Sequence, residues 1–313
     1  MKNGDKEMNY GQVRTDLALE AKESLGENEE QLRGVSVKEY DRKNVGLHIT
    51  KVQIESKNAQ QRLRKPMGIY VTMETDALTE ADEDYHRDIS ENIAKEIYDL
   101  LPKKGEEQSV LVVGLGNRFV TADALGPLVV DNLFINRHII KEYGKCAYDC
   151  KKMNAISCIE PGVMAKTGME ALEIVRGVIK ETQPDCVLVV DALAARSIKR
   201  LNRTIQISNA GIQPGSGVGN HRNELSKESL GVPVIAIGVP TVVDAATIVG
   251  DALGNILGNY KEFEKIKCLE EYRNSYHELN NMYMTGKDVD AIIKRVSYTI
   301  SEGINMALAM GMN

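Results

Sequence analysis

Two almost wholly apolar runs, each leading to an aspartate, limit the folds open to this 313-residue chain. Residues 109–114 lead through a short loop to Asp123, and residues 186–190 are followed directly by Asp191. A run such as 187–190 has no polar face, so it predicts a strand buried on both sides of a parallel sheet. Ligands bind at the carboxyl ends of such strands. We therefore expect both aspartates at one edge of a sheet, as an acid–base pair or as metal ligands.

The middle of the chain alternates between strand and helix patterns. Strands are predicted at 109–114, 155–159, 186–190, 204–208 and 233–238, and helices at 127–140, 167–181 and 242–257. This alternation is typical of an α/β fold with a mostly parallel central sheet flanked by helices.

The two ends of the chain add further elements. Apolar runs at 45–54 and 67–74 predict an N-terminal strand pair, and helical spacing predicts a helix over 79–101. Residues 1–12 are polar and without periodicity, so we expect a flexible arm, whereas 13–32 has a helix-like spacing. The tail from 260 to 313 is helical in pattern, with the following residues in phase: Ile292, Ile293, Val296, Ile300, Ile304 and Leu308.

Composition excludes several classes of function. A net charge of −6 argues against non-specific binding of nucleic acid. No secretory signal opens the sequence, and no run approaches the ~20 apolar residues of a membrane span. Five cysteines without a disulfide framework fit a reducing compartment. We expect a cytoplasmic protein with neither a membrane nor nucleic acid as a direct partner.

Asp123 taken alone has a simple structural explanation. It lies just before a predicted helix, where an N-cap aspartate stabilises by about 1 kcal/mol. However, Asp191, Glu160, Asp244 and His221 also follow predicted strands. Several titratable groups gathered at one sheet edge favour a functional site. At this point both explanations stay open.

The glycines of the chain do not predict a nucleotide site. Gly114 and Gly116 follow a strand, but the dinucleotide fingerprint needs a third glycine where this chain has Phe119, and a Walker lysine is also absent. A sharp backbone turn at the strand end explains the glycines better. The glycine-rich loop at 211–219 fits either a mobile binding loop or a plain surface connection.

Six segments of the sequence resemble one known family. They are 13–21 (VRTDLALEA), 114–117 (GLGN), 120–127 (VTADALGP), 160–163 (EPGV), 191–196 (DALAAR) and 237–244 (IGVPTVVD). Together they resemble the germination proteases of spore-forming bacteria, endopeptidases that degrade small acid-soluble spore proteins. The core is also similar to that of hydrogenase maturation proteases. Ala122 departs from the family pattern, in which proline is expected.

The resemblance implies a function and its residues. Asp123 and Asp191 would be the catalytic aspartates of an atypical aspartic endopeptidase, without cofactor or metal. The enzyme would be a homotetramer in the forespore and spore core, made as an inactive precursor that removes its own amino-terminal segment. Small acid-soluble spore proteins would be its substrates.

The resemblance also places the self-processing site. Family substrates are cut after a glutamate, ahead of an apolar residue, an alanine and, further on, another glutamate. Residues 15–20 (TDLALE) resemble this pattern, with Asp16 in place of the first glutamate. We therefore predict cleavage between Asp16 and Leu17, so that 1–16 is a propeptide and 17–313 is a single catalytic α/β domain.

Two carboxyl groups close together could hydrolyse a peptide bond, because like-charge repulsion raises one pKa and leaves one acid and one base. Two alternatives remain at this stage. The first is a metal-assisted peptidase, in which Asp123 and Asp191, with His221 or Glu160, hold a divalent ion that activates water. The second is a non-catalytic module that binds DNA-associated spore proteins or a small ligand.

Overall fold

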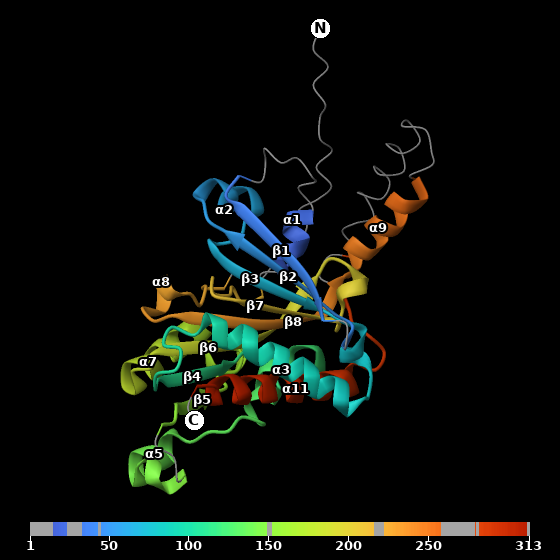
Figure 1. Cartoon of the computed structure of the whole chain (residues 1–313). Coiled ribbons are helices and arrows are strands. Elements are labelled where there is room, and N and C mark those ends of the chain that lie inside the picture. The colour runs from blue at the N-terminus through green and yellow to red at the C-terminus, as the bar shows by residue number, and fades with distance from the viewer. Residues whose placement is uncertain are drawn as a thin grey trace.

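The computed structural model describes residues 15–23, 33–42, 45–148, 152–215, 222–257, 279 and 282–311. Within these residues the strands form one nine-stranded sheet of order β1-β2-β3-β7-β8-β6-β4-β5, with β9 paired to β8 (Figure 1). The strands are β1 (Val35–Arg42), β2 (Leu47–Ile54), β3 (Gly68–Glu74), β4 (Ser109–Gly114), β5 (Ala155–Ile159), β6 (Cys186–Ala195), β7 (Thr204–Ser208), β8 (Val234–Asp244) and β9 (Tyr283–Met284).

Helices join these strands and cover the sheet. They are α1 (Ala18–Glu23), α2 (Lys57–Leu63), α3 (Glu83–Leu100), α4 (Leu125–Val130), α5 (Arg137–Tyr143), α6 (Met164–Thr167), α7 (Ala171–Thr182), α8 (Lys227–Leu230), α9 (Ala245–Leu257) and α11 (Val289–Ala309). In the described part of the chain, no helix is long and apolar enough to cross a membrane.

The predicted α/β class is confirmed, but the sheet is mixed rather than mostly parallel. In the sheet order β5-β4-β6-β8, each strand is parallel to the next. Strand β7, in contrast, runs antiparallel to both β8 and β3. The reason lies in the connection from β6 to β7. Only residues 196–203 separate the two strands, and a parallel crossover needs a dozen or more residues.

The predicted N-terminal strand pair is confirmed as β2 and β3, which pair antiparallel. Strand β1 pairs with β2 and was not predicted, because its sequence VSVKEYDR is mostly polar and all of its residues are half-buried or exposed. The strands β1–β3 continue the central sheet through the pairing of β3 with β7. Figure 1 shows them in blue at one end of the sheet.

The parallel strands are buried on both faces, as their apolar runs predicted. On one face, α3 and α11 lie side by side across the sheet (Figure 1); on the other, α7 packs against it. Alternate strand residues divide between the two sides: Val110, Val112, Leu188 and Val190 belong to the larger core, and Leu111, Val113, Val187 and Val189 to the core under α7.

The predicted helical tail is confirmed over α11. Its in-phase residues pack against α3 and the sheet, with these five buried: Ile293, Val296, Ile300, Ile304 and Leu308. The spacing of the apolar residues predicted this helix because they form one stripe that faces the core.

Two predicted helices differ from those observed. The helix predicted over 127–140 is divided into α4 and α5, because Asn136 between them is buried and pairs with β5: its Oδ1 accepts from Ile156 N at 2.7 Å, and its Nδ2 donates to Asn154 O at 3.0 Å. Of the helix predicted within 13–32, only α1 is found in the described residues. The arm at 1–12 lies outside them.

Candidate active site

A tight turn after β4 positions Asp123. Gly116 has φ +119°, and Asn117 N donates to Asp123 O at 2.9 Å. A Cβ on Gly116 would lie 2.0 Å from Asp123 O, so the turn needs glycine. On the other side of the loop, Thr241 of β8 donates from Oγ1 to Ala122 O at 2.5 Å. The glycines therefore shape the loop that carries Asp123, as the turn interpretation predicted.

A second close approach brings this loop to the end of β6. A Cβ on Gly126 would lie 2.3 Å from Leu115 O and 2.6 Å from Val190 O, so α4 begins against both strands. The N-cap of α4 is Ala124, which makes no side-chain cap hydrogen bond. Asp123 is thus not the N-cap of this helix. Its charge acts on Asp191, which lies within β6 rather than directly after its end as predicted, because the pairing of β6 with β8 continues to Ala195.

Asp191 ends the most buried part of β6, and its residue is 4% exposed. Its Oδ1 accepts from Ala192 N at 2.9 Å. Burial raises the pKa of Asp191 well above its ordinary value, and the charges of Asp123 and Asp16 raise it further. Burial also raises the pKa of the Asp123 carboxyl group, and the main-chain N–H of Asn117 and the charge of Arg222 oppose this with smaller effects. The charges of Asp123 and Asp16 therefore act on Asp191, which keeps its proton to higher pH than an ordinary aspartate does.

The predicted cleavage segment lies along the last residues of β6. Asp16 N donates to Ala194 O at 3.0 Å, and Ala194 N donates to Asp16 Oδ2 at 2.9 Å. The next side chain, Leu17, is fully buried against three apolar residues, namely Leu193, Ala195 and Val243. The bond between residues 16 and 17 is thus held next to the strand that carries Asp191.

Two side chains that the sequence analysis did not single out bind the main chain at this bond. Lys65 Nζ lies 2.9 Å from Asp16 O, and Gln206 Nε2 lies 3.2 Å from the same oxygen. Ala18 N donates to Gln206 Oε1 at 2.7 Å. The sequence signals for these two residues were weak, because Lys65 is one lysine in a basic stretch and Gln206 is one amide within the apolar strand β7.

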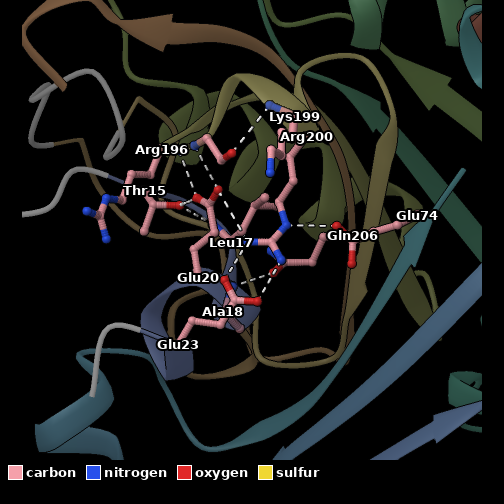
Figure 2. Close-up of polar contacts among 11 residues, drawn as sticks. Thr15, Leu17, Ala18, Glu20, Glu23, Glu74, Arg196, Lys199, Arg200 and Gln206 are labelled. Carbon is pink, nitrogen blue, oxygen red and sulfur yellow. Dashed lines mark hydrogen bonds and ion pairs between the residues drawn. The ribbon is translucent and has the colours of Figure 1, made fainter. Parts of the chain in front are cut away.

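The carboxylate of Glu20, on the fourth residue after this bond, is bound by a set of main-chain and side-chain donors that we call the Glu20 seat (Figure 2). The Glu20 carboxylate accepts from Arg196 N at 2.8 Å and Ser197 N at 3.0 Å, and from the Thr15 hydroxyl. Arg200 Nη1 lies 3.5 Å from Glu20 Oε1. The Glu20 side chain is 2% exposed, so these donors replace water around a buried charge.

Arg200 is itself held in place by two further glutamates. Its guanidinium forms ion pairs of 2.7 Å with Glu23 and 2.8 Å with Glu74 of β3 (Figure 2). The paired carboxylates fix the orientation of the planar guanidinium beside Glu20. The seat is therefore prepared by residues of β3, of α1 and of the connection from β6 to β7.

The other acidic candidates have structural partners. Glu160 forms a 2.6 Å ion pair with Arg118. Asp244 accepts from Thr247 N at 2.9 Å at the start of α9. His221 lies outside the described residues. Among the residues that the structure describes, no three His, Cys, Asp or Glu side chains gather so as to hold a metal ion.

Interacting carboxyl groups where β4 ends beside β6, with a peptide segment held along β6, are what acid–base hydrolysis of a peptide bond requires. Comparison with known proteins agrees with this chemistry. Residues 13–267 match the model of the peptidase A25 family, the germination proteases. The chain therefore belongs to the germination protease family, and the family predicted from the sequence is confirmed.

Individual relatives cover almost the whole chain. The germination protease of Caldanaerobacter subterraneus subsp. tengcongensis is 43% identical, over 96% of this chain and 95% of its own. That of Clostridium tetani is 41% identical, over 95% of each chain, and that of Bacillus cytotoxicus is 40% identical, over 95% and 93%.

A solved structure shows a weaker similarity. The [NiFe] hydrogenase maturation protease HycI from Thermococcus kodakarensis is 22% identical, over 47% of this chain and 80% of its own, with a TM-score of 0.28. A TM-score this low supports no conclusion about the site.

Proposed function

We propose that this protein is an endopeptidase that begins the degradation of small acid-soluble spore proteins during germination, in the spore core. It is made as a precursor that first cuts its own chain between Asp16 and Leu17. The observation that supports this most directly is the position of Asp16, hydrogen-bonded to Ala194 of β6 and close enough for its charge to raise the pKa of Asp191.

The proposed mechanism uses Asp123 and Asp191 as a pair. The ionised member takes a proton from water, whose oxygen bonds to the carbonyl carbon of residue 16, while the electron pair of the carbonyl moves to its oxygen. The C=O bond then re-forms, the C–N bond breaks, and the protonated member gives its proton to the amine of Leu17. The products are a carboxyl group on Asp16 and a free amine on Leu17. Since the two groups titrate as a coupled pair, either assignment of acid and base satisfies this scheme.

The precursor would be inactive on other proteins because its own segment fills the site. Residues 15–20 take up the main-chain contacts with β6, the apolar contacts of Leu17 and the Glu20 seat. Cleavage releases 1–16 as the propeptide and leaves 17–313 as the catalytic domain. A substrate can bind only when the new amino terminus leaves these positions.

The contacts made by Leu17 and Glu20 fit the residues that the substrates are expected to present at these two positions. Family substrates present an apolar residue and an alanine after the cut, then a glutamate, and this segment presents Leu17, Ala18 and Glu20. An acidic side chain four residues after the bond would find the main-chain donors Arg196 N and Ser197 N, with Arg200 beside them. The homotetramer implied by the family stays a prediction.

Incubation of the full-length chain tests self-processing directly. Intact-mass spectrometry should show the loss of 16 residues and a product that begins at Leu17, and Asp123→Asn and Asp191→Asn should keep full length. The processed enzyme should then cut a purified acid-soluble spore protein after glutamate. A wild-type chain that never shortens and never cuts that protein would contradict the proposal and favour the non-catalytic binding module. Loss of activity on exhaustive chelation, restored by one divalent metal, would favour the metal-assisted alternative.

A further inference from the structure

Two hydrogen-bond donors from distant parts of the chain meet on the carbonyl oxygen of Asp16. Lys65 follows α2, at the start of the link to β3, and Gln206 lies in β7. Their nitrogens are 2.9 and 3.2 Å from that oxygen. A carbonyl oxygen has two lone pairs, and here a donor is available for each. In the self-processing proposed above, this is the oxygen that becomes negatively charged when water adds.

The sheet places Gln206 opposite Asp191. Gln206 pairs with Gly238 of β8, and Gly238 pairs with Asp191 of β6, so the three residues form one row across the sheet. Paired residues on neighbouring strands point to the same face. Gly238 has no side chain of its own, and a Cβ there would lie 2.5 Å from the Leu193 side chain, which packs over it. The Leu193 side chain therefore covers Gly238, and the row has a donor at one end and an acid at the other.

Gln206 holds the peptide on both sides of the bond between residues 16 and 17. Its Oε1 accepts from Ala18 N and its Nε2 donates to Asp16 O. The residue is 9% exposed. Both ends of one buried amide are thus directed at the segment that we propose is cut, on either side of the bond.

The Lys65 ammonium group supplies the charge that this carbonyl needs. Its nitrogen contacts two main-chain oxygens, Thr15 O at 3.3 Å and Asp16 O at 2.9 Å. Burial lowers the pKa of Lys65, and the charges of Asp16 and Glu20 oppose that effect. Lys65 is half-buried, and a cation partly removed from water stabilises a nearby oxyanion more than an exposed cation does.

We propose that Lys65 and Gln206 are catalytic residues that bind the carbonyl oxygen of the scissile bond and stabilise its negative charge after water adds. This inference rests on the proposed self-processing between Asp16 and Leu17. Both groups act as hydrogen-bond donors throughout, and neither forms a covalent bond. The aspartates move the protons, whereas Lys65 and Gln206 lower the energy of the tetrahedral intermediate. A protein substrate in the same position would present its carbonyl to the same two donors.

The first-order rate of self-processing of the full chain tests this inference. Gln206→Glu keeps an oxygen to accept from Ala18 N but, when ionised, loses the donor to Asp16 O. We expect it to be slower by roughly 10²–10³-fold, the loss typical of one such donor. Lys65→Met should cause a similar loss, and Lys65→Arg, which keeps a charged donor, should recover part of the rate. Lys104→Met, which removes a lysine that pairs with Asp99 on α3, is the matched control and should process like wild type.

Parallel reactions of Asp123→Asn and Asp191→Asn separate this inference from the proposed function. If both process at the wild-type rate, the proposed aspartate mechanism fails, whatever the two donors do. If both stop while Gln206→Glu and Lys65→Met process at the wild-type rate, only the inference about the two donors is overturned. Equal losses in Lys65→Met and Lys65→Arg would also overturn it, because they would show that the shape of lysine matters rather than its charge. Thermal unfolding of each variant checks the fold, and Gln206→Glu decides the outcome if Lys65→Met does not fold.

Discussion

Asp16 and Ala194 are joined by two hydrogen bonds, from Asp16 N to Ala194 O at 3.0 Å and from Ala194 N to Asp16 Oδ2 at 2.9 Å. The second bond uses the side chain of Asp16, so this residue is held to β6 by both its main chain and its carboxylate. Asp191 lies three residues earlier in the same strand. The contact therefore fixes which peptide bond of the amino-terminal segment lies along the strand that carries the buried acid.

Substitution of either aspartate should stop self-processing without unfolding the protein. Asparagine keeps the shape of the side chain but can neither take up nor release the proton, and general acid–base catalysis contributes about 10²–10⁴-fold. We expect the rate for Asp123→Asn or Asp191→Asn to fall by at least that factor, as measured by intact mass over time. Normal cleavage by Asp191→Asn would remove that residue from the mechanism.

The rate of self-processing should pass through a maximum as pH changes. The mechanism needs one carboxyl group ionised and one protonated, and the pKa of Asp191 is raised by burial and by the charge of Asp123. As pH rises through that raised value, the proton is lost and the rate falls. At lower pH the second group becomes protonated and the rate falls again. A rate that keeps rising toward alkaline pH, with the fold intact by circular dichroism, would contradict the paired mechanism.

The raised pKa of Asp191 should also cost stability at neutral pH. The folded state keeps a proton that the unfolded state releases, so the free energy of unfolding falls as pH rises from the ordinary carboxyl value through the folded pKa. Asp191→Asn has no such proton. We expect this variant to be more stable than wild type at neutral pH and to lose the advantage at acidic pH. Denaturant unfolding at several pH values measures the difference, and a constant difference across pH would show that Asp191 ionises normally.

The Glu20 seat should be needed for self-processing. Glu20→Gln keeps an acceptor but loses the charge, and hydrogen bonds to charged groups contribute about 1.5–3 kcal/mol. If the seat holds the bond in place, processing should slow by roughly tenfold or more. Glu23→Gln is the matched control, since Glu23 also pairs with Arg200 but its side chain is 49% exposed; exposed pairs contribute little. Equal effects of the two substitutions would show that the ion pairs around Arg200 matter, rather than the seat.

The sequence predicted those features that depend on short segments. The apolar run before Asp191 indicated a strand buried on both faces, and the spacing of Ile293, Val296 and Ile300 indicated α11, because each pattern reports the burial of its own element. The two aspartates were expected at one sheet edge for the same reason, since parallel strands end together. Membership of the germination protease family followed from the motifs around them.

Features that depend on contacts between distant segments were not predicted. Strand β7 was recognised, but its antiparallel direction follows from the short connection after β6 and from its pairing with β3. Gln206 gains its significance only because Gly238 separates it from Asp191 in the sheet. Lys65 lies 49 residues from Asp16 in sequence, and nothing in its neighbourhood predicts that contact. Such relations appear only when the register of the sheet is known.

Gly116→Ala tests whether the turn after β4 exists to position Asp123. Two glycines with positive φ differ in the space around them: a Cβ on Gly116 would lie 2.0 Å from Asp123 O, whereas a Cβ on Gly231 would meet nothing within 4 Å. Gly231→Ala should therefore cost only about 1–2 kcal/mol of backbone strain. Gly116→Ala adds a collision with the main chain of Asp123, so it should destabilise more and should slow self-processing beyond the loss of folded protein. Unfolding in denaturant gives the stability, and the processing rate per folded molecule gives the effect on the site. If that rate is unchanged, the turn contributes to stability alone, and self-processing does not depend on the position that the turn gives to Asp123.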